Sequence, residues 1–258
     1  MDLGLTGRSA LVTGASKGIG YAAAASLAQA GCSVHLAART KADLEAARDR
    51  LKQEYGVEVE VHATDLSNGD AARALVERCK DVDILVNNAG AIPAGDIHTV
   101  TEERWRDAWN LKVFGYQNMC RAMLAHMRER GNGVIINVIG SAGEAHTPAY
   151  IAGTAGNASL MAMTRALGAT SRSYGVRVVG INPGLIATDR MTNLLRTKAE
   201  KELGDAAKWE ELVDKTYPPG KPEHIGDMVA FLASDRSANT TGTILTIDGG
   251  SSARGTSV

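Results

Sequence analysis

Three glycines near the start of the chain stand at a spacing that suits the binding of a phosphate group. Gly14, Gly18 and Gly20 lie in the stretch TGASKGIG, between an apolar run typical of a strand and a segment with helical periodicity. Glycine permits the tight turn and close backbone approach that a pyrophosphate requires, and the helix start offers free N–H groups to the anion. Because the loop joins a strand to a helix, the pattern predicts a dinucleotide site.

The elements that must position this loop alternate along the whole chain. Short, mostly apolar runs predict strands at 9–15, 33–38, 57–64, 82–90, 133–140, 176–184 and 244–250. Helical periodicity fills the intervals, at 18–30, 41–55, 68–79, 103–130, 150–174 and 223–234. Continuous apolar runs suit strands covered on both faces, and right-handed crossovers then build a doubly wound parallel sheet. We therefore expect one Rossmann-type α/β domain over residues 1–258, a three-layer α/β/α sandwich of about seven strands.

A polar segment at about 186–220 interrupts this alternation before the last helix–strand unit. Its pattern is helical, and it ends in the loop-like YPPGKPE. An insertion at the carboxyl edge of a parallel sheet lies where ligands bind, so we expect a substrate lid. Its apolar residues Met191, Leu194, Leu195 and Trp209 suggest a small-molecule substrate that is itself apolar.

Further motifs make the sequence similar to the short-chain dehydrogenase/reductase family across essentially its whole length. They are NNAG at 87–90, Asp65-Leu66 after the third strand, NLKVFG at 110–115, NPG at 182–184 with Thr188, and IDGG at 247–250. The resemblance implies hydride transfer between a nicotinamide cofactor and a carbonyl or alcohol carbon. It also implies a homodimer or homotetramer packed through the long helices at 103–130 and 150–174.

The resemblance also assigns the cofactor-binding residues. They are Gly14, Ser16, Lys17, Gly18, Ile19 and Gly20 at the pyrophosphate; Asp65 and Leu66 at the adenine; Asn87, Ala89 and Gly90 at the adenosine ribose; and Pro183, Gly184, Ile186 and Thr188 at the nicotinamide. An acidic residue at the end of the second strand would bind the ribose diol of NAD, but Arg39 follows Ala38 there, and Lys17 stands nearby. Two cations favour the 2′-phosphate of NADP, so NAD is the less expected cofactor.

The catalytic positions of the family are occupied by unusual residues. Family members use a tyrosine as acid/base, a lysine that lowers its pKa, a serine that holds the substrate oxygen, and an asparagine that anchors a water. The asparagine position matches Asn110. Counted from YGVRVVGINPG and GVIINVIGSAG, the serine, tyrosine and lysine fall at Gly140, Gly153 and Asn157. The chain is therefore expected to be an atypical member that lacks the usual Ser-Tyr-Lys triad.

Tyr150 provides a phenol in the same region. An alternative register would make Tyr150 the family tyrosine, but it needs gaps and places Thr154 at the lysine position. Tyr150 precedes Asn157 by seven residues, which is the tyrosine-to-lysine spacing of the superfamily's enoyl reductases. Residues 150, 153 and 157 share a helix face, so the phenol can reach the cleft. Asn157 can bind ribose hydroxyls but has no charge to lower the pKa of a phenol.

The predicted catalytic residues are thus Asn110, Tyr150 and Asn157. Ser141, Glu144 and His146 are further candidates in the adjacent loop. Lys112 is expected at the surface, because it lies two residues from Asn110 and so on another helix face.

Three functions remain open. The first is an NADP(H)-dependent oxidoreductase of non-standard mechanism that reduces a carbonyl or an activated C=C bond. The second is a catalytically impaired NADP-binding pseudoenzyme, and the third is a non-redox enzyme that retains a bound cofactor. Retention of Thr188 and Asn110 at the nicotinamide end favours the first, because a site for adenine alone has no need of them.

Composition argues against several other classes of protein. The 258-residue chain has a formal net charge of −1 and no dense Lys/Arg cluster, so no nucleic-acid partner is expected. The apolar runs are too short to span a membrane, and the N-terminus has no signal-peptide pattern, so a cytoplasmic location is expected. Cys32, Cys79 and Cys120 are scattered and match neither a disulfide framework nor a metal cluster. They are expected to be small buried residues, with no metal bound.

Overall fold

Seven parallel strands form the central sheet, in the order β3-β2-β1-β4-β5-β6-β7. The computed structural model describes residues 2–253. The strands are β1 (Ser9–Thr13), β2 (Ser33–Ala38), β3 (Val59–Ala63), β4 (Ile84–Asn87), β5 (Gly133–Val138), β6 (Val176–Pro183) and β7 (Ile244–Ile247). The strand order reverses between β1 and β4, and in such sheets the ligand lies at the carboxyl ends of the strands beside this point. The predicted Rossmann-type α/β fold is confirmed.

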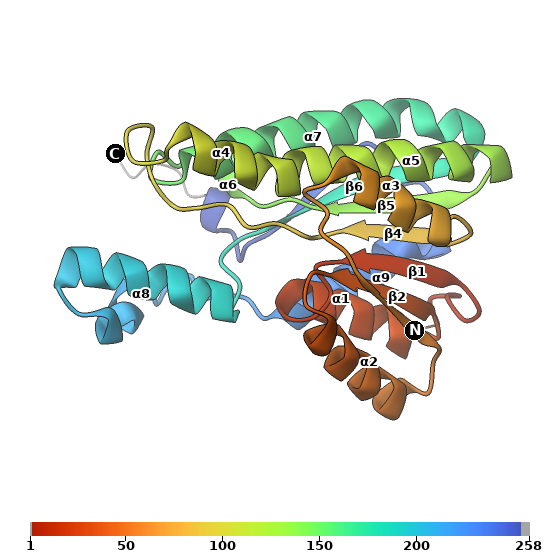
Figure 1. Cartoon of the computed structure of the whole chain (residues 1–258), viewed down its shortest axis with the longest axis horizontal. Coiled ribbons are helices and arrows are strands. Elements are labelled where there is room, and N and C mark those ends of the chain that lie inside the picture. Colours follow the sequence, from red (N-terminus) through yellow and green to blue (C-terminus); the bar gives the residue numbers. More distant parts are fainter. Residues whose placement is uncertain (1, 254–258) are drawn as a thin grey trace.

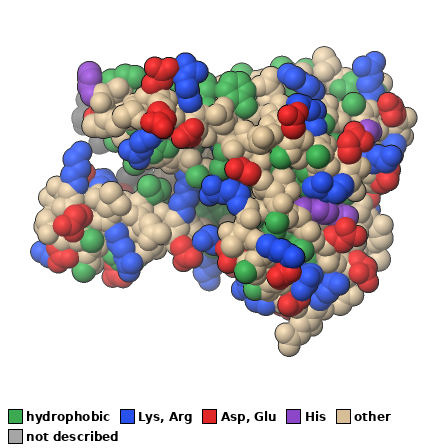
Figure 2. Space-filling model, in the orientation of Figure 1, with side chains coloured by type: hydrophobic (Ala, Val, Ile, Leu, Met, Phe, Trp, Pro, Cys, Tyr) green, Lys and Arg blue, Asp and Glu red, His purple; other side chains and the backbone are tan. Residues whose placement is uncertain are grey.

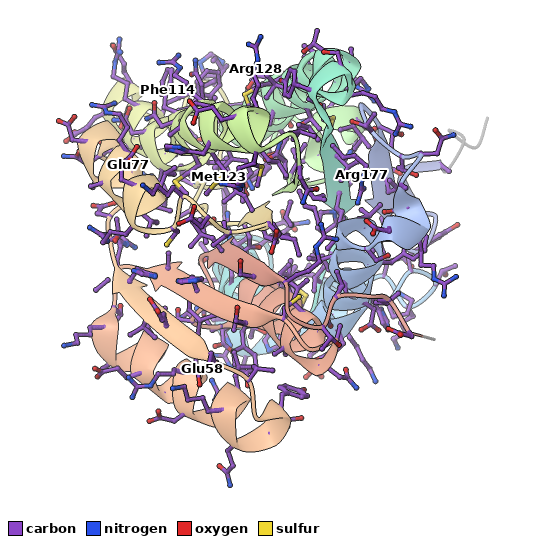
Figure 3. All side chains as sticks on the ribbon, turned by 90° about the vertical axis from the view of Figure 1, so that its right-hand side faces the viewer. Glu58, Glu77, Phe114, Met123, Arg128 and Arg177 are labelled. Carbon is purple, nitrogen blue, oxygen red and sulfur yellow. The ribbon has the colours of Figure 1, made fainter. Side chains whose placement is uncertain are left out.

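Helices cover both faces of the sheet (Figure 1). One face packs against α1 (Gly18–Gln29), α2 (Lys41–Tyr55) and α9 (Pro222–Ala233). The other face packs against α3 (Gly69–Arg78), α5 (Gly115–Arg130) and α7 (Ile151–Ser171). Neighbouring strand residues alternate between the two cores: Ile136 lies in the first, whereas Ile135 lies in the second with Met123 of α5 (Figure 3). This two-sided burial explains why the strands are apolar throughout.

The remaining segments are short, apart from α8. They are α4 (Glu102–Trp109), α6 (Ala142–Ala145), α8 (Asp189–Leu203), and 3₁₀ turns at Arg172–Tyr174, Ala206–Leu212, Asp235–Ser237 and Ser251–Ala253. Among the helices of residues 2–253, none is both long and apolar enough to cross a membrane.

The helix expected over 103–130 is interrupted by one turn of π-helix. This turn covers Asn110–Phe114 and joins α4 to α5. A π turn holds more residues than an α turn, so the side chains after it are rotated relative to a continuous α-helix. Asn110 is exposed at its start, whereas Lys112 is only 7% exposed. The expectation of a surface position for Lys112 is therefore wrong: the two residues do lie on different faces, but the buried face is the one that carries Lys112.

The segment expected to be a lid projects from the body of the molecule. In Figure 1, α8 extends away from the sheet, and Figure 2 shows a hollow between this part and the rest. Its base is closed by a parallel bridge between Ile186 and Gly220, and α8 packs against the 3₁₀ turn Ala206–Leu212. Thr188 caps α8 by accepting a hydrogen bond from the Met191 N–H at 3.3 Å. Movement of this segment over a substrate stays a prediction.

Candidate active site

Two adjoining cavities lie at the carboxyl ends of the strands. The first, of about 360 Å³, is formed around Gly14, Gly18 and Arg39 and is called here the glycine-loop cavity. The second, of about 370 Å³, is formed around Gly140, Tyr150 and Asn157 and is called the tyrosine cavity. The two cavities share four lining residues: Ile19, Asn88, Thr188 and Arg190. A molecule lying in one cavity can therefore extend into the other.

The glycine-loop cavity contains most of the residues predicted at the adenosine and pyrophosphate end. Those that line it are Gly14, Ser16, Lys17, Gly18, Ile19, Arg39, Leu66, Ala89 and Gly90. Gly20 packs instead beneath the loop, where an added Cβ atom would overlap the carbonyl oxygen of Gly14. The start of α1 carries no acidic residue in its first turn, so its partial positive charge is available to an anion.

Charge in the glycine-loop cavity is net positive. Lys17, Arg39 and Arg190 line it, together with the carboxylates of Asp43 in the first turn of α2 and Asp189 in the first turn of α8. Asp65 lies outside this cavity and accepts hydrogen bonds from the backbone N–H and the hydroxyl of Ser67, at 3.0 and 2.8 Å. These bonds hold the pKa of Asp65 below its usual value, and the charge of Arg39 acts in the same direction. A 2′-phosphate would meet two cations there.

Asn87 does not reach the glycine-loop cavity, although the ribose was its predicted partner. It is the last residue of β4, and its side chain points into the core, where it donates to Asn137 Oδ1 at 2.9 Å. Asn88 lines both cavities in its place and donates to the carbonyl oxygens of Thr13 and Gly14. The alternation of side chains along a strand turns consecutive asparagines to opposite sides.

The tyrosine cavity is lined by two of the three positions counted from the sequence, Gly140 and Asn157, and the third, Gly153, packs against Tyr150. A Cβ atom added at Gly140 would lie 2.9 Å from Asn157 Nδ2, so these two residues are in contact. A Cβ atom added at Gly153 would overlap the ring of Tyr150. The Tyr150 ring therefore fills the space in which a side chain at position 153 would begin. Pro183, Gly184, Ile186 and Thr188, predicted at the nicotinamide, line the same cavity.

The hydroxyl of Tyr150 is paired with a cation that the sequence did not indicate. Arg190 Nη2 donates to Tyr150 Oη at 3.3 Å, and the same guanidinium donates to the carbonyl oxygens of Gly90 and Ile92. Burial raises the pKa of the Tyr150 phenol, and the charge of Arg190 opposes this effect only in part. At neutral pH the phenol is protonated, so Tyr150 can donate a hydrogen bond to a ligand oxygen.

Lys112 is the buried cation of the tyrosine cavity. Its Nζ donates to Tyr116 Oη and to the Val138 carbonyl oxygen, both at 2.8 Å, and its stem packs over Gly90. An ammonium group has three donors, so one remains free to face the cavity that Lys112 lines. Burial lowers the pKa of Lys112 to about 7, and the charge of Arg190 acts in the same direction. This proximity to neutrality suits a group that gives and takes a proton.

The other predicted catalytic residues are divided between this cavity and its surroundings. Asn157 is buried, and its Oδ1 has no hydrogen-bond partner within residues 2–253. Asn110 is exposed and lines a separate cavity with Asp65, so the structure does not bring it to Tyr150. Ser141 lines the tyrosine cavity. Glu144 accepts a hydrogen bond from Thr246 Oγ1 instead.

Sequence reasoning therefore missed three residues that face the two cavities: Asn88, Lys112 and Arg190. The second asparagine of NNAG was a usable signal for Asn88. Lys112 stands among apolar residues in NLKVFG, which could have indicated burial. Arg190 has no local signal, because its contacts are with segments about 40 and 100 residues earlier in the chain.

Comparisons with known proteins identify the family of this chain. Residues 8–199 match the family model described as short chain dehydrogenase. The chain is 32% identical over 253 residues to the 3-oxoacyl-(acyl-carrier-protein) reductase FabG of Chlamydia trachomatis serovar D, covering 95% of this chain and 98% of that protein. The structure is similar, with a TM-score of 0.89 and 30% identity, to L-sorbose reductase from Gluconobacter frateurii complexed with NADPH and L-sorbose. That match covers 96% of this chain and 98% of that one.

A further structural relative holds the other nicotinamide cofactor. It is an NAD⁺-bound xylitol dehydrogenase, with a TM-score of 0.86 and 25% identity, covering 95% of this chain and 99% of that chain. Structural similarity alone thus does not decide between the two cofactors for this chain.

Proposed function

Because the chain belongs to the short chain dehydrogenase family, we propose that it is an NADP(H)-dependent reductase of non-standard mechanism, acting on a carbonyl or an activated C=C bond. The observation that supports this most is the continuity of the two cavities through Asn88, Thr188 and Arg190. A dinucleotide held by the glycine loop would reach the groups around Tyr150. When bound, NADPH would supply the hydride, so this chain must supply the proton and stabilise the charge that forms on the substrate oxygen.

The preference for NADP rests on residues of this chain. Lys17, Arg39 and Arg190 face the glycine-loop cavity, against the carboxylates of Asp43 and Asp189. A phosphate ester with two negative charges is stabilised by this excess of positive charge, and the arginine fork can bind it in bidentate fashion. The NADPH in the L-sorbose reductase complex is consistent with this choice.

In this proposal Lys112 supplies the cation that Asn157 cannot. It is buried, lines the tyrosine cavity and has one ammonium proton not engaged by Tyr116 or Val138. As hydride reaches the substrate carbon, negative charge develops on the carbonyl or enolate oxygen. Lys112 would transfer its proton toward this oxygen and regain one from solvent, while the protonated Tyr150 donates a hydrogen bond. Low local polarity strengthens both interactions.

Asn157 is suited to holding the cofactor rather than to proton transfer. Its buried Oδ1 lacks a partner within the described residues, and a buried amide oxygen left unpaired costs about 1–3 kcal/mol. A ribose hydroxyl of the nicotinamide half would satisfy it. The lining of the cavity is largely apolar, with Ile92, Val138 and Ile139 among its residues, which favours a substrate with an apolar body beside the reacting carbonyl.

One observation favours a second candidate function, an NADP-binding protein without turnover. Positions 140 and 153 carry no side chain, so the serine and tyrosine expected from the family resemblance are absent there. Under this alternative, Lys112 and Tyr150 would contribute only to packing. Both candidates predict NADPH binding, and they differ in whether bound NADPH is consumed.

Stopped-flow oxidation of NADPH with a panel of ketones and enones tests the proposal. We expect at least one substrate to be reduced, with product and oxidised cofactor formed in equal amounts. Lys112→Met should slow the reaction, whereas Lys80→Met, which changes an exposed lysine, should not. NADPH that binds but is oxidised by no compound would support the non-catalytic alternative. Product formed without a change at the nicotinamide absorbance would support a non-redox enzyme.

A further inference from the structure

A second cluster of chemically active side chains lies on the sheet edge formed by β2 and β3. It consists of His35 of β2, His62 of β3 and Cys79, which ends α3. Neither proposed cavity includes these residues. His35 and His62 are partly buried, with 19% and 11% of their side-chain surface exposed, and Cys79 is 2% exposed. The cluster is therefore held in place by packing and yet accessible from solvent through its histidines.

The three potential ligand atoms converge on one point. His35 Nδ1 and His62 Nε2 are 3.2 Å apart, and Cys79 Sγ lies 3.8 Å from the first and 3.5 Å from the second. With zinc bonds of about 2.0–2.1 Å to nitrogen and 2.3 Å to sulfur, tetrahedral geometry separates two nitrogens by about 3.3 Å and a nitrogen from a sulfur by about 3.5 Å. The observed separations match this triangle.

A fourth group stands beside the triangle. Glu60, also on β3, places Oε2 3.5 Å from His35 Nδ1 and 4.0 Å from His62 Nε2. Its side chain is 68% exposed, so it is free to adjust its position. In the sheet, His35 pairs with Glu60, and Ala37 pairs with His62. Paired residues and alternate residues of a strand lie on the same face, so both histidines and the carboxylate lie on the face covered by α3.

Hydrogen bonds within the cluster pair its nitrogen and sulfur atoms less completely than a bound metal ion would. Two neutral imidazoles share one proton between the facing nitrogens, and a thiol has one proton to donate. An imidazole nitrogen without a proton has one lone pair, so it cannot accept fully from both the facing imidazole N–H and the Cys79 thiol. A divalent cation bound by two imidazoles and a thiolate removes this conflict, and binding replaces the thiol proton.

We propose that His35, His62 and Cys79 form a structural site for zinc, with Glu60 as the fourth ligand. Two nitrogens, one sulfur and one oxygen in tetrahedral arrangement suit Zn²⁺ better than the oxygen-seeking Mg²⁺ or Ca²⁺. The ligands come from β2, β3 and the end of α3, so the metal would tie this helix to the edge of the sheet. The expected effect is on stability, and the reductase function proposed above is independent of it.

The test uses the purified full-length chain with Zn²⁺ or Co²⁺ as the only added ligand. We expect one zinc per chain to survive dialysis and to raise Tm. The Co²⁺ form should show a thiolate-to-metal charge-transfer band and the intense visible bands of tetrahedral cobalt. Cys79→Ser should remove the charge-transfer band, and His62→Ala should weaken binding by at least tenfold. Glu60→Gln should weaken metal binding less than His62→Ala does, because Glu60 is exposed.

Matched controls separate the site from adventitious binding. Cys32→Ser changes another buried thiol, and His126→Gln changes a histidine that pairs with Glu77, so both should bind zinc as the unmodified chain does. If Cys79→Ser does not fold, the cobalt spectrum of the unmodified chain still decides whether a thiolate ligates the metal. The proposal is overturned if the unmodified chain retains no zinc, or if its cobalt spectrum lacks the thiolate band. NADPH oxidation by metal-free protein would leave the proposed reductase function intact in either case.

Discussion

The glycine-loop cavity and the tyrosine cavity adjoin each other, but they depend on the sequence in different ways. The first combines the glycines and the N–H groups that begin α1 with the cations Lys17, Arg39 and Arg190. The second depends on individual side chains: Tyr150 fills the space beside Gly153, and Asn157 lies against Gly140. Phosphate binding thus relies on the backbone conformation of a strand–loop–helix unit, whereas proton transfer relies on single side chains.

Lys112→Met gives the strongest test of the difference between the glycine-loop cavity and the tyrosine cavity. If Lys112 donates the proton, we expect kcat/KM for NADPH-dependent reduction to fall by roughly 10²–10⁴-fold, the usual contribution of a general acid. NADPH affinity, measured by fluorescence titration, should change little, because the glycine-loop cavity is untouched. Unchanged turnover in this variant would show that the tyrosine cavity works without its buried cation.

The free energy of unfolding, measured as a function of pH, tests the pKa of Lys112 without any substrate. The pKa of Lys112 is about 7 in the folded chain, against an ordinary lysine value of 10.5. Between these values the unfolded chain binds a proton that the folded chain does not, so stability rises with pH across this window. Below about pH 7 the folded chain carries the full cost of a buried charge, on the order of 1.4 kcal/mol per pKa unit.

Lys112→Met should therefore stabilise the protein most below pH 7, and this gain should shrink as the pH approaches 10. Urea unfolding at several pH values measures the difference. The Tyr116 hydroxyl keeps its hydrogen bond to the Val138 carbonyl, 2.7 Å long, so the substitution leaves that oxygen paired. A pH-independent difference between the two proteins would mean that Lys112 titrates near its ordinary value.

Arg39→Asp should affect the other cavity alone. Loss of a charge-assisted bond to the 2′-phosphate, together with the new repulsion, should weaken NADPH binding by about 10–100-fold, corresponding to roughly 1.4–2.7 kcal/mol. NADH binding should be weakened less or improved, since a carboxylate can bind the ribose diol. Titration of the variant with NADPH and with NADH gives the ratio of the two affinities. An equal loss of affinity for both cofactors would contradict a phosphate site at Arg39.

Tyr150→Phe is expected to have the smallest effect. The ring still covers Gly153, and the variant loses only the hydroxyl that Arg190 contacts at 3.3 Å. Removal of one hydrogen bond to the developing oxyanion should lower kcat by about tenfold, or about 1.4 kcal/mol, with KM nearly unchanged. Steady-state kinetics on the best ketone or enone measures this, and no change in kcat would assign Tyr150 to packing.

The sequence by itself determined the sheet and the glycine loop. These features follow from local rules: strand and helix periodicity, the backbone freedom of glycine, and the stacking of residues three and four apart on a helix. The assignment of the family's serine, tyrosine and lysine positions to 140, 153 and 157 stays a prediction, and in the structure Gly140 contacts Asn157.

Only the tertiary structure decided which side chains face the cavities. Within the π turn, Lys112 lies on the buried face and Asn110 on the exposed one. Arg190 reaches Tyr150 from a helix that begins almost 40 residues later, and His35, His62 and Cys79 meet from three separate elements. Contacts of this kind depend on the packing of distant segments, and no local spacing in the chain records them.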